Sequence, residues 1–281
     1  NDEPTEQITT EENKKQDTQK EKQTAAEQNK DELESEITAQ NEQNEEHNQN
    51  ELNTIEEKDI NQEQEEEGNQ SEEVVNQTEE KEQKTGNEEP KNAFSKTNLD
   101  VIDMYLPLSN SEERIGEITH IVIHFSSDVA NNPDNPYNIY NIYNIFKNYK
   151  VSTHYTIDRE GKIYRMVNED RAAWHAGKGS LPDYPHYENK LNQYSIGIEL
   201  LAIGTKEELH KLVPHVDYES IDPVHIGYTD AQYESLKLLI DDITKRNPTI
   251  KMDRKHIIGH DEYTDRRTDP GSLFDWSRIG F

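Results

Sequence analysis

The segment whose residues are best suited to chemistry runs from residue 259 to residue 271. It places His260 and Asp269 nine positions apart, with Arg267 two residues before the aspartate and a Pro-Gly pair closing the loop. An imidazole and a carboxylate are both ligands for first-row metal ions, and they leave room for a third ligand from elsewhere in the chain. The alternative is a surface loop in which His260 caps a helix or packs against neighbouring side chains. A further candidate ligand on a core strand favours the metal site.

That further ligand is a histidine at the end of a predicted buried strand. Residues 118–125 are short, β-branched and almost continuously apolar, which is the pattern of a central strand. His124 lies at the carboxyl end of this strand, where open α/β sheets place their sites. His120 falls on the same face by alternation, but it enters near the opposite end. Position along the strand therefore favours His124 as the ligand.

A carboxylate interrupts a second predicted core strand, at residues 194–201. Glutamate is poorly tolerated in such an apolar run unless it is paired, binds a metal or works as a base. The alternative is a glutamate at the end of the strand that faces solvent. Because buried ionisable groups cluster at functional sites, we predict a functional role for Glu199.

Small residues bracket a tryptophan and a histidine at positions 172–177. An indole beside an imidazole, flanked by Gly and Ala, is suited to form the wall of a site for a sugar or a peptide. The alternative is a packed Trp174 with an incidental His175.

The remaining pattern predicts the elements that position these residues. Apolar residues at helical spacing indicate two helices, and two β-rich runs around a Gly turn indicate a hairpin. In chain order we expect a lead-in (91–117), a helix (136–150), a hairpin (151–167), an inserted surface loop (204–228) and a helix from Thr229 or Asp230 to about Arg246.

Acidic charge is concentrated in the first third of the chain. The formal net charge is −29; residues 1–90 hold 30 acidic and 8 basic groups, a net of −22, and residues 91–281 hold 29 and 22, a net of −7. The first 90 residues contain no Phe, Tyr or Trp, so they cannot bury enough apolar surface to offset the entropy of ordering. We expect residues 1–93 to be a disordered acidic spacer and residues 94–281 to form one domain.

Composition also limits the classes of partner and of site chemistry that the chain can have. The acidic balance argues against nucleic acid, which needs clustered Lys and Arg. No apolar run approaches the roughly 18–20 residues that span a bilayer. The absence of cysteine excludes disulfides, thiolate ligands and a Cys nucleophile. The sequence starts at Asn1, which favours a processed or truncated product that has already lost any signal or anchor.

Together these features resemble one family, the zinc-dependent N-acetylmuramoyl-L-alanine amidases related to phage-T7 lysozyme and the peptidoglycan recognition proteins. The resemblance covers about residues 118–276, and five motifs in the family's order are jointly specific. The motifs are Ile121-Val122-Ile123-His124, Ser152-Thr153-His154-Tyr155 with the turn at 158–161, Trp174-His175-Ala176-Gly177, Ser195-Ile196-Gly197-Ile198-Glu199, and Gly259-His260 continuing to Arg267-Thr268-Asp269-Pro270-Gly271.

The resemblance implies an α/β fold with a mixed central sheet flanked by helices. In the family a strand-end histidine, a late histidine and a Cys or Asp hold zinc, which maps one ion onto His124, His260 and Asp269. The aspartate version agrees with the absence of cysteine. The phage-T7-lysozyme branch has a tyrosine at the position aligned with Thr153 and no acid at position 199, so this chain follows the glutamate branch.

The same resemblance implies the remaining roles. Glu199 would act as the base, and Arg267 would stabilise the oxyanion. Arg267 stands where relatives carry Lys, a departure because its planar fork differs from a compact ammonium. The residues expected to bind substrate are Trp174, His175, His154 and Tyr155.

The implied substrate is peptidoglycan, cut at the amide between N-acetylmuramic acid and L-alanine, by a protein expected to be a monomer. Such a substrate implies a secreted or cell-wall-associated protein, of the autolysin or endolysin kind. One alternative is a binding module without activity, although all three ligands are present. Another is a zinc amidase that acts on soluble muropeptides. A third assigns the function to residues 1–90 as a charged docking tail, which the lack of aromatic anchors disfavours.

Overall fold

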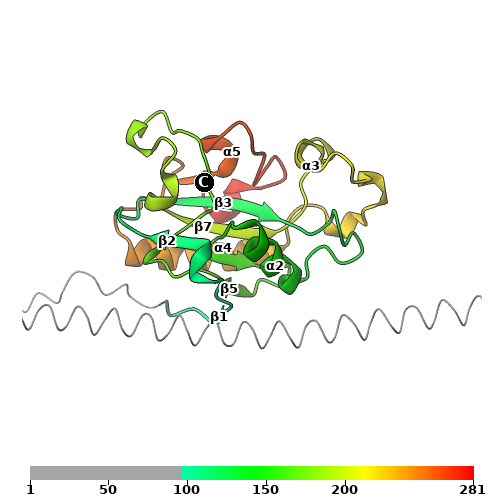
Figure 1. The fold of residues 1–281 in the computed structure, drawn as a ribbon, viewed down its shortest axis with the longest axis horizontal. Coiled ribbons are helices and arrows are strands. Elements are labelled where there is room, and N and C mark those ends of the chain that lie inside the picture. The colour runs from blue at the N-terminus through cyan, green and yellow to red at the C-terminus, as the bar shows by residue number, and fades with distance from the viewer. Residues whose placement is uncertain (1–96) are drawn as a thin grey trace, which may run out of the picture.

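The computed structural model describes residues 97–281, and its centre is a six-stranded sheet (Figure 1). The strand order is β1-β5-β4-β7-β3-β8. The strands are β1 (Val101–Asp103), β3 (His120–Ser126), β4 (Tyr155–Ile157), β5 (Ile163–Arg165), β7 (Ser195–Leu201) and β8 (Ile257–Gly259). The predicted spacer, residues 1–93, lies outside the described residues and stays a prediction.

The sheet is mixed, as the resemblance implied. β4 and β5 form the predicted antiparallel hairpin, and the other pairs within the sheet are parallel. β1, from the lead-in, adds to the edge through β5. A separate antiparallel pair joins β2 (Ser111–Glu113) to β6 (Arg171–Ala173).

Helices cover both faces of the sheet. They are α2 (Ile139–Tyr149), α3 (Lys206–Leu212), α4 (Asp230–Arg246) and α5 (His260–Tyr263). The short 3-10 turns are η1 (Leu108–Asn110), η2 (Pro185–Tyr187), η3 (Leu191–Tyr194), η4 (Tyr218–Ser220), η5 (Pro223–His225) and η6 (Trp276–Ile279). The prediction of a mixed α/β fold with flanking helices is confirmed.

The strand β3 lies between β7 and β8, in the buried position that its sequence predicted. Ile121 and Ile123 pack in the same core cluster as α4, whereas Val122 packs on the other face with the loop that follows β6. Because side chains alternate along a strand, His124 shares the face of Val122. The predicted ligand therefore points away from α4.

The helix α4 agrees with its prediction at both ends. The Thr229 hydroxyl accepts a hydrogen bond from the Gln232 backbone amide, and the Gln232 side-chain oxygen accepts one from the Thr229 backbone amide, which makes a capping box. The helix ends at Arg246, before Asn247. In contrast, α2 begins at Ile139, later than expected, because the side chain of Asn138 caps it.

The segment 204–228 is more than the surface loop that we predicted. It contains α3, which lies to one side of the sheet in Figure 1, and Thr205 and Glu208 form a capping box at its start. The Thr-x-x-Glu pattern was a sequence signal for this helix.

The described residues contain no helix that combines the length and the apolar character needed to cross a membrane.

Candidate active site

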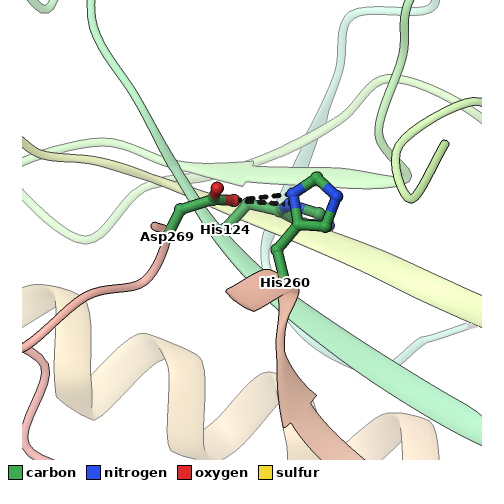
Figure 2. A group of neighbouring side chains, drawn as sticks. All are labelled: His124, His260 and Asp269. Carbon is green, nitrogen blue, oxygen red and sulfur yellow. Dashed lines mark hydrogen bonds and ion pairs between the residues drawn. The ribbon is translucent and has the colours of Figure 1, made fainter. Parts of the chain in front are cut away.

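Three predicted ligands from separate parts of the sequence meet at one edge of the sheet (Figure 2). His124 lies near the end of β3, and His260 is the first residue of α5, directly after β8. Since β3 and β8 run parallel, their carboxyl ends share one edge and bring the two imidazoles together. Asp269 reaches the same point from the loop after α5, where its carbonyl accepts a hydrogen bond from the Asp261 amide at 2.9 Å.

The ligand atoms of these residues are tightly grouped and buried. Nδ1 of His124 lies 2.8 Å from Oδ2 of Asp269 and 3.1 Å from Nδ1 of His260, and Nδ1 of His260 lies 3.0 Å from the same carboxylate oxygen. The three residues are between 2% and 5% exposed. Two imidazoles and one carboxylate thus converge on one point that could hold a metal ion.

The electrostatics of the cluster favour a neutral His124 beside an ionised Asp269. Burial, assisted by the neighbouring His260, lowers the pKa of His124 to about 4. Burial alone would raise the pKa of Asp269, but hydrogen bonds with His124 and His260 outweigh it and hold that pKa well below its usual range. The ionised carboxylate of Asp269 beside a neutral His124 therefore offers negative charge that a cation would neutralise.

The other ring nitrogen of His260 fixes its tautomer. Nε2 lies 3.0 Å from the backbone carbonyl of Ala176, which can only accept a hydrogen bond, so Nε2 carries the proton. In this tautomer the Nδ1 lone pair of His260 faces the lone pairs of Asp269 at 3.0 Å. Two acceptors at this distance repel one another unless a cation or a proton lies between them, so the arrangement fits a metal site.

Glu199 lies beside this cluster. It is the register partner of His124 across the β3–β7 pair, and it is 8% exposed. The hydroxyl of Ser126 donates to its Oε2 at 2.7 Å. Burial, followed by the negative charge of Asp269, raises the pKa of Glu199 to about 8. A bound cation would oppose that rise. Sequence reasoning missed Ser126, whose position two residues after His124 was the available signal.

Arg267 influences the site electrostatically. Its side chain is exposed on the loop that carries Asp269, and its positive charge lowers the pKa of both Glu199 and His124. The guanidinium is therefore within electrostatic range of the site, and its role as an oxyanion partner stays a prediction.

The inserted segment 204–228 holds the loop that carries Asp269. The carboxylate of Glu208 in α3 accepts hydrogen bonds from the amides of Ser272 at 2.7 Å and Thr205 at 2.8 Å. The hydroxyl of Tyr228 donates to the carbonyl of Pro270, next to the ligand, at 2.6 Å. Sequence reasoning missed both residues, because their partners in the loop that carries Asp269 lie more than 40 positions away in the chain.

Two residues predicted to bind substrate lie inside the protein, and a substrate contact by either stays a prediction. His154 is 0% exposed: its Nδ1 accepts a hydrogen bond from the Gly197 amide at 3.0 Å, and its Nε2 faces the carbonyl of Arg171 at 3.1 Å. Tyr155 is 1% exposed, and its hydroxyl donates to Glu169 at 2.7 Å. Both side chains are hydrogen-bonded inside the protein.

The pair Trp174 and His175 is only partly buried. The backbone amide of Trp174 donates a hydrogen bond to the Ser152 hydroxyl at 2.7 Å. Nδ1 of His175 lies 3.0 Å from Nε2 of His124. His175 thus contacts a metal-ligand candidate directly, while a substrate contact by either residue stays a prediction.

The chain is similar to several bacterial amidases. It is 38% identical over 130 residues to the 1,6-anhydro-N-acetylmuramyl-L-alanine amidase AmpD of Haemophilus influenzae, a match that covers 46% of this chain and 56% of that protein. The AmpD of Escherichia coli is 36% identical over 131 residues, covering 46% and 57%. The N-acetylmuramoyl-L-alanine amidase AmiD of Escherichia coli is 28% identical over 138 residues, covering 46% and 44%. The chain therefore spans about half the length of these relatives.

These relatives contradict the prediction of a secreted or cell-wall-associated protein. Six similar proteins carry the name AmpD and are described as 1,6-anhydro-N-acetylmuramyl-L-alanine amidases. The predicted location was inferred from the polymer as the substrate. It was wrong, and the autolysin or endolysin role that depended on it loses its support as well.

The family itself follows from a longer match. The family model described as N-acetylmuramoyl-L-alanine amidase matches residues 114–272, which is more than half of the 281 residues and includes all five motifs of the predicted site. The chain belongs to the N-acetylmuramoyl-L-alanine amidase family.

Proposed function

We propose that this protein is a zinc-dependent N-acetylmuramoyl-L-alanine amidase, which hydrolyses the amide between the lactyl group of N-acetylmuramic acid and L-alanine of the stem peptide. The observation that carries the proposal is the buried convergence of His124, His260 and Asp269 beside Glu199. A metal-ligand set with an adjacent base can hydrolyse an unactivated amide.

The donor set fits one zinc ion. Two imidazoles and one carboxylate suit zinc, and three protein ligands leave a fourth position open. Ligand atoms about 2.0–2.1 Å from a tetrahedral zinc lie roughly 3.3 Å from one another. The separations of 2.8–3.1 Å between Nδ1 of His124, Nδ1 of His260 and Oδ2 of Asp269 are close to that value. Zinc bound there would supply a Lewis acid and a hydroxide nucleophile at neutral pH.

Glu199 is placed to move the proton. Ser126 holds its Oε2, which leaves Oε1 to receive the proton of the attacking water. Glu199 then delivers this proton to the amide nitrogen as the C–N bond breaks, and the second proton of the water also ends on the released nitrogen, so the products are the lactyl carboxylate and the ammonium group of L-alanine. The carboxylate returns to its starting form.

Arg267 supplies positive charge on the exposed side of the site. We assign it to the oxygen of the substrate carbonyl, where negative charge develops in the tetrahedral intermediate. Its influence on the pKa of Glu199 supports this placement.

We propose that the catalytic unit is residues 94–281, preceded by the acidic segment 1–93, which lies outside the described residues. β1 supports the early start, since it pairs with β5 from a position before residue 114, where the family match begins.

The names of the AmpD relatives favour a second candidate substrate, a soluble 1,6-anhydro muropeptide. Both substrates contain the same amide, so the site chemistry is unchanged. A non-catalytic binding module is disfavoured because the complete donor set and the adjacent glutamate are present.

The test compares the two substrates under metal control. Purified peptidoglycan and a 1,6-anhydro muropeptide are incubated with the protein, and new L-alanine amino termini are followed with chelator and after zinc is added back. Release that chelation abolishes and zinc restores supports the proposal, and the ratio of rates selects the substrate. No release from either substrate by a zinc-loaded protein rejects it.

A further inference from the structure

We infer that His175 and Ala176, two adjacent residues outside the ligand set, fix the tautomers of both histidine ligands and so present two Nδ1 lone pairs to the metal before it binds. The inference rests on the proposed zinc site, and it makes His175 a positioning residue. Its support is a chain of hydrogen bonds in which each proton has one possible place.

The chain begins at a backbone carbonyl. The hydroxyl of Ser195 donates to the carbonyl of Leu191 at 2.6 Å. A serine hydroxyl has a single hydrogen, so towards its other neighbour it can only accept. That neighbour is Nε2 of His175, 3.1 Å away, and His175 Nε2 must therefore carry a proton.

The same proton determines the other side of the His175 ring. The ring of His175 contacts His124, Ser195, His154 and Gly197, none of which carries the negative charge that would favour an imidazolium, so the ring carries one proton. With that proton on Nε2, Nδ1 of His175 is an acceptor. Nε2 of His124 lies 3.0 Å from it and must donate.

The consequence reaches the metal ligand. A neutral His124 that is protonated on Nε2 carries a lone pair on Nδ1, the atom that faces Asp269 and His260. Ala176 does the same for His260 through its carbonyl. Both imidazoles are thereby held in the tautomer that a metal requires, by side chain and backbone of neighbouring residues.

The segment that contains His175 and Ala176 is itself held by hydrogen bonds and packing. The side-chain oxygen of Asn192 accepts hydrogen bonds from the amides of His175 at 3.2 Å and Ala176 at 2.8 Å. The ring of His175 lies against Gly197 of β7, where a Cβ atom would come within 2.6 Å of the ring. Glycine at this position makes the room that the ring occupies, so the location of His175 is built into the sheet.

The first test reads the tautomers directly in the zinc-free full-length protein. Long-range proton–nitrogen NMR correlations assign which ring nitrogen carries the proton in each histidine. We expect Nε2–H for His124, His175 and His260. An Nδ1–H tautomer for His124 or His175 overturns the inference, and this readout needs no variant.

The second test measures zinc affinity by competition with a chelator. His175→Phe removes the acceptor and should weaken zinc binding about 10- to 100-fold, the usual effect of losing such a partner. His175→Asn places an amide oxygen near the Nδ1 position and should restore affinity to within a few-fold of the wild type. Ser195→Ala should fall between them.

The matched control is His215→Phe, which changes an exposed histidine in the inserted segment and should leave zinc affinity unchanged. Unfolding curves of each zinc-free variant confirm that it is folded. Wild-type affinity in a folded His175→Phe variant rejects the positioning role even if the protein is an active amidase. Conversely, the expected affinities in a protein without hydrolysis reject the proposed function and leave the positioning role intact.

Discussion

The two ends of β3 each carry a buried histidine on the same face, and they differ in what surrounds it. His120 is 0% exposed and His124 is 2% exposed, and burial is the main cause that lowers the pKa of each to about 4. By burial and pKa alone, the two residues are indistinguishable.

Their partners separate them. The His120 ring lies 4.7 Å from the ring of Tyr184, 5.3 Å from that of Tyr187 and 5.3 Å from that of His256. Its Nδ1 faces the hydroxyl of Thr119 at 2.8 Å, and within residues 97–281 its Nε2 has no hydrogen-bond partner. His120 is thus a core histidine in an aromatic cluster.

At the carboxyl end of β3, both ring nitrogens of His124 have polar partners. One faces His175, and the other faces a carboxylate and a second imidazole. The comparison teaches that a lowered pKa marks burial, while converging acceptors that need a cation mark a site. The predictions below test this distinction.

The largest difference should come from removing each histidine in turn. His124→Ala deletes a metal ligand, so zinc affinity should fall by more than the roughly 10- to 100-fold expected from losing a mere supporting partner, and hydrolysis should become undetectable. His120→Asn should retain both. Zinc titration and release of L-alanine termini provide the measurement, and zinc binding by His124→Ala with the affinity of the wild type would break the comparison.

Glu199→Gln should separate catalysis from metal binding at the same end of β3. The variant keeps the shape but cannot take a proton, so the rate should fall about 10²- to 10⁴-fold while zinc binding persists. Glu234→Gln, on an exposed position of α4, is the matched control. A rate within a factor of two of the wild type for Glu199→Gln would assign the base elsewhere.

His120 should contribute to acid sensitivity at the other end. Its folded-state pKa of about 4 lies below the ordinary value of 6.5, so the unfolded chain binds the proton more readily. Its contribution is complete above pH 6.5 and is lost as the pH falls towards 4, by up to about 3 kcal/mol. The neighbouring groups that titrate or carry charge are His256, Asp253 and His186.

The measurement is urea unfolding of the zinc-free protein between pH 7 and pH 4, in chelator so that metal release plays no part. His120→Asn removes the titrating group, so the free energy of unfolding should fall less steeply with acid than in the wild type. Equal slopes in the two proteins would show that His120 does not titrate as its surroundings indicate.

The smallest effect is expected at the support of the Asp269 loop. Glu208→Ala removes the acceptor for the amides of Ser272 and Thr205, and should weaken zinc binding by no more than about 10-fold, since the loop keeps its other contacts. Glu207→Ala, an exposed neighbour in α3, is the control. Unchanged affinity in Glu208→Ala would show that the loop holds Asp269 without help from α3.

The local sequence pattern predicted many of the strands and helices that position the site. The apolar run at 118–125 and the capped helix that starts at Thr229 were recognisable because strand burial and helix capping depend on neighbouring residues. Glu199 stood out because a carboxylate conflicts with the apolar strand around it. The metal-ligand candidates followed from residue type, position at strand ends and resemblance, and the structure brings all three together.

The remainder depends on contacts between distant residues. His154 is buried because the amide of Gly197 supplies its hydrogen bond from another strand, which no local pattern reveals. The position of His175 against His124 arises across 51 residues, and the support of the Asp269 loop by Glu208 across about 60. Sequence spacing identified the reactive groups, whereas their supporting partners required the three-dimensional arrangement.

The most direct test of the account locates zinc in crystals of the protein grown with one equivalent of the metal. Anomalous difference density at the zinc edge should show one peak bonded to Nδ1 of His124, Nδ1 of His260 and Oδ2 of Asp269, at the usual distances of about 2.0–2.2 Å. A peak beside His120 and His256, or no peak at the carboxyl end of β3, would contradict it.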